Sequence, residues 1–195
     1  MRLPLEDELR AERYRLVETL EGLSDADFDA GTTLCARWTP RDVLGHLICS
    51  DYVLGSYLPY GGRINDANDA QAERVRGMSR PRLMEWARHW AYSPSPAGRL
   101  LAAPLLLGDL GIHHQDIVRG LGLTREVPRT VAGAILREGL QLSLWLNRRV
   151  LRHRIVPTDG GRSYGRGPEV LGTREALGLW LAGRDSVARE LTFVA

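Results

Sequence analysis

Apolar residues recur every three or four positions along most of this chain, in segments that proline and glycine interrupt, and this spacing is what most constrains its fold. Such a period places apolar side chains on one face of an α-helix. Helices are predicted over residues 5–22, from Pro40 to before Pro59, over two stretches that follow a linker at 63–69 and separate near Gly77, over 100–121 and over 128–150, with a loop at 93–98. The prediction is a mainly α fold, an up-and-down helical bundle with short loops.

The second helix has the clearest start. Thr39 can cap it, Pro40 occupies its first position, and Asp42 lies in the first turn, near the positive end of the helix dipole. His46 follows among aliphatic residues of the same helix.

The character of the sequence changes after Leu151. Two short segments, 153–158 and 164–171, surround an Asp-Gly-Gly turn and predict a β-hairpin, after which Thr173 caps a last helix. We therefore expect two parts, a helical bundle at 1–150 and a hairpin-helix appendage at 151–195. The tryptophans Trp86, Trp90, Trp145 and Trp180 are predicted to lie in the core.

Composition excludes several classes of function. The 26 basic residues, all arginine, are scattered among 24 acidic ones and leave a net charge of +2, so nucleic-acid binding is not expected. Two cysteines make no disulfide framework. The longest apolar run, 100–107, is shorter than the roughly 20 residues of a membrane helix, and the first residues are too acidic for a signal peptide. We expect a cytoplasmic protein that binds neither membranes nor nucleic acids.

Asp109 and His113 are the residues that could carry chemistry. Four positions apart on a helix, they lie on one face, where a carboxylate and an imidazole can hold one metal ion or simply bond to each other. His46 would be a third ligand, or a satisfied core histidine; two histidines and a carboxylate with a vacant position are typical of catalytic zinc or non-haem iron. Cys49 is either a competing ligand, which would close a structural zinc site, or a small buried apolar residue. Asp116 either orients a ligand histidine from behind or pairs with Arg119.

Four segments carry a family resemblance. Residues 38–47 (WTPRDVLGHL) and 113–122 (HHQDIVRGLG), with the tail segments 165–172 and 180–184, are similar to signatures of the mycothiol-dependent maleylpyruvate isomerase family, which belongs to the DinB-like superfamily of metal-binding four-helix bundles. By matching positions, the resemblance implies His46, Asp109 and His113 as metal ligands. Asp109 departs from the family pattern, which has glutamate there.

The resemblance implies a divalent metal, most simply zinc, together with mycothiol or a similar thiol. The expected function is a thiol-dependent transferase or isomerase in which the metal stabilises a thiolate that attacks a small electrophile. Arg41 or Arg119 would hold carboxylates of the thiol or substrate. The alternative is a non-catalytic DinB-like domain that binds metal or ligand and regulates. Expected partners are the small-molecule thiol and electrophile, in a monomer or homodimer.

Overall fold

A computed structural model of the chain describes residues 5–51, 57–61, 63–92 and 103–194. Its larger helices are α1 (Glu6–Glu21), α3 (Pro40–Ser50), α5 (Ile64–Arg76), α6 (Arg80–Tyr92), α8 (Ala103–Gly120), α9 (Arg129–Leu146) and α11 (Arg174–Leu181). The shorter elements are α2 (Asp25–Ala30), η1 (Leu58–Tyr60), α10 (Arg149–Arg152), η2 (Asp185–Glu190) and the strands β1 (Arg154–Pro157), β2 (Glu169–Gly172) and β3 (Thr192–Val194). The mainly helical fold is thus confirmed. The loop expected at 93–98 lies outside the described residues.

The chain divides into two compact units. The first contains 1–106 and 113–125, and the second contains 107–112 and 126–195, so α8 contributes residues to both. The boundary expected after residue 150 stays a prediction, but α9 lies in the second unit and not with the earlier helices. In the described part of the chain, no helix combines the length and the apolar character needed to cross a membrane.

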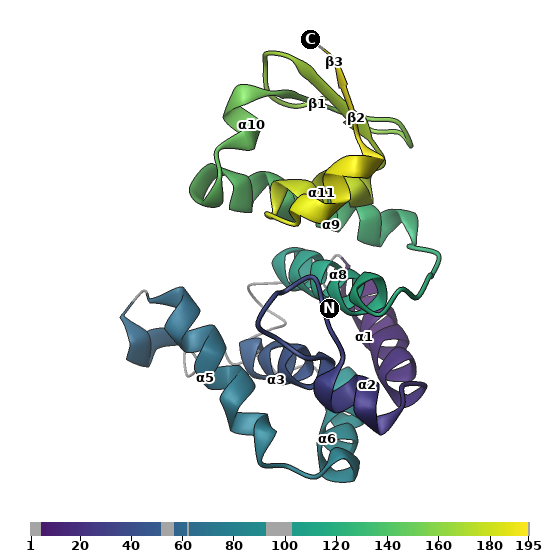
Figure 1. The fold of residues 1–195 in the computed structure, drawn as a ribbon, viewed down its shortest axis with the longest axis vertical. Helices are drawn as coiled ribbons and strands as arrows, with labels where there is room; N and C mark the ends of the chain where they lie inside the picture. The colour runs from purple at the N-terminus through teal and green to yellow at the C-terminus, as the bar shows by residue number, and fades with distance from the viewer. Residues whose placement is uncertain (1–4, 52–56, 62, 93–102, 195) are drawn as a thin grey trace. The chain divides into compact units, whose positions relative to one another are not determined.

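In the first unit, α3 is a fully buried helix. Every residue from Pro40 to Ser50 is buried, with α5 and α6 packed against it, while α1 packs along α6 (Figure 1). The predicted start of α3 is confirmed, because Thr39 and Asp42 form a reciprocal capping box. The predicted break near Gly77 is also confirmed, since α5 ends there and α6 begins at Arg80. The linker predicted at 63–69 is wrong, because α5 already begins at Ile64.

In the second unit, α9 and α11 pack closely through glycines. A Cβ at Gly139 would lie 2.3 Å from the carbonyl oxygen of Gly178, so only glycine permits this approach. Trp180 is buried, as predicted, but Trp145 is 85% exposed, and its placement in the core was wrong.

The β-hairpin prediction is wrong in its pairing. β1 and β2 are parallel, and β3 pairs antiparallel with β2 to complete a three-stranded sheet. The connection 158–168 first turns back to form an antiparallel bridge between Ile155 and Tyr164, then turns again through Gly165 and Gly167, both at positive φ. The second reversal brings β2 in alongside β1 in the same direction.

Candidate metal centre

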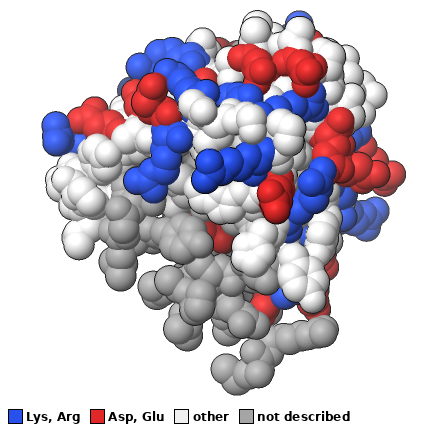
Figure 2. Space-filling view, turned by 90° about the horizontal axis from the view of Figure 1, so that it is seen from below, with Lys and Arg blue, Asp and Glu red and all other residues white. Residues whose placement is uncertain are grey.

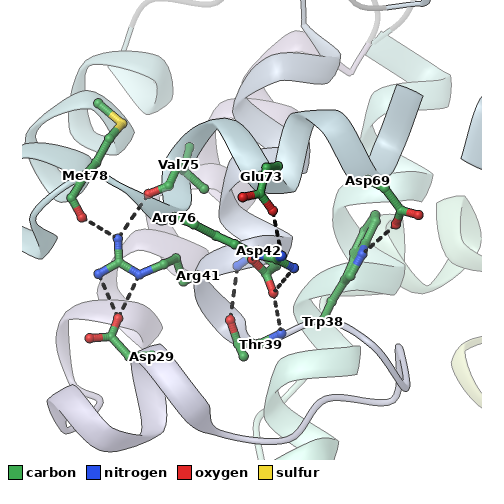
Figure 3. A network of polar contacts seen from close by, with 10 residues as sticks. All are labelled: Asp29, Trp38, Thr39, Arg41, Asp42, Asp69, Glu73, Val75, Arg76 and Met78. Carbon is green, nitrogen blue, oxygen red and sulfur yellow. Dashed lines mark hydrogen bonds and ion pairs between the residues drawn. The ribbon is translucent and has the colours of Figure 1, made fainter. Parts of the chain in front are cut away.

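A polar network fixes α3 against α5 at the end of α3 where the chain enters (Figure 3). Arg76 of α5 donates to the capping carboxylate of Asp42 at 2.9 Å. The Arg41 guanidinium binds Asp29 and the carbonyl oxygens of Val75 and Met78. Arg41 is therefore occupied within the fold, which argues against its expected role in holding substrate carboxylates.

His46 lies one turn beyond this network and is buried, with 3% of its surface exposed. Its Nδ1 lies 2.8 Å from Oε1 of Gln71, a buried residue of α5. A carboxamide oxygen only accepts, so this contact favours the tautomer with the proton on Nδ1 and leaves the lone pair on Nε2. The amide nitrogen of Gln71 is buried and has no hydrogen-bond partner among the described residues.

The second histidine is held in the same way. His113 of α8 has its Nδ1 2.9 Å from Oδ2 of Asp116, one helical turn further on and fully buried. Asp116 therefore contacts His113 directly, while its predicted role of orienting a metal ligand stays a prediction. Nε2 of His113 is the nitrogen left for a metal.

The predicted ligand atoms of His46, Asp109 and His113 all lie within 4.8 Å of one another. Asp109 and His113 share α8, where a separation of four residues puts them on one face. The two imidazole rings lie edge to face, with centroids 5.0 Å apart. Trp38 covers both, with ring centroids 5.0 Å from His46 and 5.7 Å from His113.

Glu138 of α9 lies close enough to Asp109 to be affected by its charge. Burial, and secondly the charge of Asp109, raises the pKa of Glu138 to about 7. Its Oε2 has no hydrogen-bond partner in the described part of the chain. The donor set that suits a divalent cation is the Asp109 carboxylate with the two imidazoles.

Of the two cysteines, Cys35 lies beside a candidate ligand, whereas Cys49 is buried, as in the second of its predicted alternatives. Cys49 belongs to neither of the ligand clusters found among the described residues, and burial raises the pKa of its thiol. Cys35, which was not singled out, lies with Sγ 3.2 Å from Asp116 Oδ2 and 3.8 Å from His113 Nδ1. No local pattern marks Cys35, Gln71 or Trp38, because each meets the histidines only through contacts between distant segments.

His114, the neighbour of His113, serves a different cluster in the first unit. Its Nδ1 bonds Glu12 at 2.8 Å and its Nε2 bonds Thr19 at 2.9 Å, and burial lowers its pKa. Glu12 also pairs with Arg125 and Arg15. Burial acts to raise the pKa of Glu12, but the hydrogen bond with His114 and the charge of Arg125 outweigh it and lower that pKa to about 2.

Charge on the surface is mixed. In the face shown in Figure 2, arginine and acidic side chains alternate without a continuous region of one sign.

Comparisons with known proteins give one matching family model and one similar fold. Residues 9–89 match the family model of the mycothiol maleylpyruvate isomerase N-terminal domain. Two crystal structures are similar over 98% of this chain and 93% of theirs, with a TM-score of 0.64 and 16% identity: the mycothiol-dependent maleylpyruvate isomerase and its histidine-to-alanine mutant. No curated protein gives a significant match.

Proposed function

We propose that this chain, which carries the N-terminal domain of the mycothiol-dependent maleylpyruvate isomerase family, is a metal-dependent enzyme that uses a thiol of the mycothiol type. Its reaction would be the transfer of the thiol to a small electrophilic substrate, or the isomerisation of such a substrate. The conclusion rests on one observation: the ligand atoms of His46, Asp109 and His113 lie within 4.8 Å of one another. We place the activity in the cytoplasm, where small thiols are kept reduced.

Each proposed ligand histidine has its Nδ1 atom held by a neighbouring side chain. Gln71 and Asp116 occupy the two Nδ1 atoms, so that each ring has its lone pair on Nε2 and a fixed orientation. A divalent metal bound by this set would supply Lewis-acid activation of a thiol.

The chain's own residues supply the remaining requirements. Trp38 packs over both imidazoles and shields them from water, and its indole nitrogen is held at 3.3 Å by Asp69. The unpaired amide nitrogen of Gln71 is a buried donor beside His46, and an acceptor atom of a bound ligand would satisfy it. No described side chain is needed as the nucleophile, because the thiol provides it.

The test compares His46→Ala with His89→Ala, which changes an exposed histidine of α6. Both chains also carry Cys35→Ser, so that the thiol beside His113 cannot hold an ion. Both proteins are purified without chelator, analysed for metal, and assayed for thiol consumption with a panel of electrophiles. We expect His46→Ala alone to lose metal and thiol consumption together, with unchanged helical content. Equal metal in both variants would refute the site. Metal retention with no thiol consumption in the unmodified protein would instead favour the non-catalytic binding domain.

Two substitutions test Asp109 as a ligand, because it stands where the family pattern has glutamate. Asp109→Asn keeps the size and removes the charge, so we expect metal affinity to fall by at least tenfold, on the order of the loss of an outer-sphere partner. Asp109→Glu keeps the charge and has the longer carboxylate of the family pattern. We therefore expect the glutamate variant to retain metal. Loss of metal in Asp109→Glu but not in Asp109→Asn would exclude Asp109 as a ligand.

A further inference from the structure

Cys35, His113 and Asp116 form a second cluster of potential ligands within the first unit. We propose that these three residues bind a thiophilic divalent metal ion, such as Zn²⁺ or Cd²⁺, at a site separate from that of His46 and Asp109. The ligand atoms are Cys35 Sγ, His113 Nδ1 and Asp116 Oδ2, which lie within 4.8 Å of one another. A thiolate, an imidazole and a carboxylate are the donor types that such ions prefer.

The spacing of these atoms is close to that of a metal ligand set. Ligands on one tetrahedral zinc lie about 3.3–3.6 Å apart, given metal–ligand distances of about 2.0–2.3 Å. Here Nδ1 and Oδ2 are 2.9 Å apart, Sγ and Oδ2 3.2 Å, and Sγ and Nδ1 3.8 Å. Shifts of about 0.4 Å or less in each separation would admit the ion.

The loop that carries Cys35 is held in place before any ion arrives. The Thr33 hydroxyl accepts from the backbone N–H of Cys35 at 3.1 Å, and the N–H of Leu34 donates to the carbonyl oxygen of Asp116 at 3.0 Å. Gly120 lets the loop lie directly on α8, since a Cβ there would be 2.4 Å from the Thr33 Cα. Preorganised ligands lose little freedom on binding, which favours affinity.

The charges and protons balance. Cys35 releases its thiol proton to solvent, while His113 stays neutral and moves its proton from Nδ1 to Nε2. The thiolate and the Asp116 carboxylate together offset the two positive charges of the ion, which a buried position requires. One proton is therefore released for each ion bound.

The Cys35 site and the proposed catalytic site compete for His113. This competition is the one part of the inference that rests on the proposed function. A neutral imidazole has one lone pair, so His113 cannot serve both sites. With an ion on Nδ1, its Nε2 carries the proton and is lost as a partner for His46 and Asp109. An ion held by Cys35 therefore excludes metal from the proposed catalytic site.

The experiment is a titration of metal-free protein with Cd²⁺ in thiol-free buffer, followed by the ultraviolet charge-transfer absorption of a cadmium thiolate. We expect the absorption to saturate at one ion per chain, with one proton released. Cys49→Ser is the matched control and should keep the absorption, whereas Cys35→Ser should lose it. Asp116→Asn, nearly isosteric, should weaken binding at least tenfold, and circular dichroism verifies that each variant is folded.

The outcomes separate this inference from the proposed function. His46→Ala should keep the absorption, since His46 is not a ligand of this site. An absent absorption in the unmodified protein, or one lost in Cys49→Ser and kept in Cys35→Ser, overturns the site even if metal bound through His46 persists. When Cd²⁺ is added to zinc-loaded protein, the absorption should grow as zinc is released. Growth of the absorption with all zinc retained would overturn the competition.

Discussion

The buried carboxylate of Glu12 makes the stability of the protein depend on pH. Its side chain is fully buried between His114, Arg15 and Arg125, and its pKa falls from 4.5 to about 2 on folding. Because the folded pKa is lower, the contribution of Glu12 is complete above pH 4.5 and is lost as the pH falls toward 2. At about 1.4 kcal/mol per pKa unit, that contribution is about 3 kcal/mol.

Glu12→Gln should therefore lower the free energy of unfolding at pH 7, and the difference from the unmodified protein should shrink between pH 4.5 and pH 3. Urea unfolding at a series of pH values measures this difference. A deficit that stays the same at low pH would show that Glu12 acts through packing rather than charge.

Gln71 is expected to tune metal affinity without touching the metal. Gln71→Leu removes the acceptor for Nδ1 of His46, so the ring loses its fixed tautomer, and affinity should fall about 10- to 100-fold. Gln71→Glu keeps an acceptor and should restore binding. The ¹⁵N shifts of His46 in the metal-free protein report the tautomer directly. An unchanged proton on Nδ1 in Gln71→Leu would show that Gln71 does not position His46.

At the scale of elements, the contact between α3 and α5 governs where His46 and Gln71 meet. A Cβ on Gly45 would lie 2.3 Å from Cγ2 of Val75, which is fully buried and cannot move outward. Gly45→Ala should separate the helices, lower the free energy of unfolding by about 1–3 kcal/mol and weaken metal binding.

Gly77→Ala is the matched control for that substitution. Gly77 ends α5 at φ −80°, and a Cβ there meets nothing within 4 Å, so stability should be unchanged or slightly higher. Denaturant unfolding of the two variants tests the contact. Equal stabilities would mean that α3 and α5 can separate without cost.

Local sequence signals predicted the elements that depend on local contacts. Thr39, Pro40 and Asp42 determine the start of α3 within one helical turn, and the sequence was sufficient to predict it. Strand pairing depends on partners far along the chain, which local sequence signals do not identify. The two segments around the glycine turn therefore predicted a hairpin, although the connection reverses twice and β1 and β2 pair in parallel. Helical spacing likewise placed Trp145 on an apolar stripe, but the described residues leave that part of α9 uncovered.

At the scale of the whole molecule, the candidate site combines segments that no single motif contains. His46 lies on α3, Gln71 on α5 and His113 on α8. Helical spacing alone could pair Asp109 with His113, and the family resemblance added His46. Gln71 and Cys35 could not be predicted from the sequence. Their hydrogen bonds join residues 25 and 81 positions apart, respectively, and such contacts leave no local sequence signal.

Metal binding by this assembled site should be coupled to the stability of the entire chain. The unfolded chain does not bring α3 and α8 together, so an ion bound only by the folded state raises the free energy of unfolding, by about 2.7 kcal/mol at a free concentration 100 times the Kd. Chelator should lower the Tm of the unmodified protein, and added Zn²⁺ should raise it again with a dependence on concentration.

His89→Ala should respond as the unmodified protein does, because that histidine is exposed and is not a proposed ligand. His46→Ala, made in a chain that also carries Cys35→Ser, should respond much less, since only Asp109 and His113, both on one helix, would remain for the ion. Differential scanning fluorimetry across a zinc series measures all three, and an equal response of His46→Ala would show that the stabilising ion binds elsewhere.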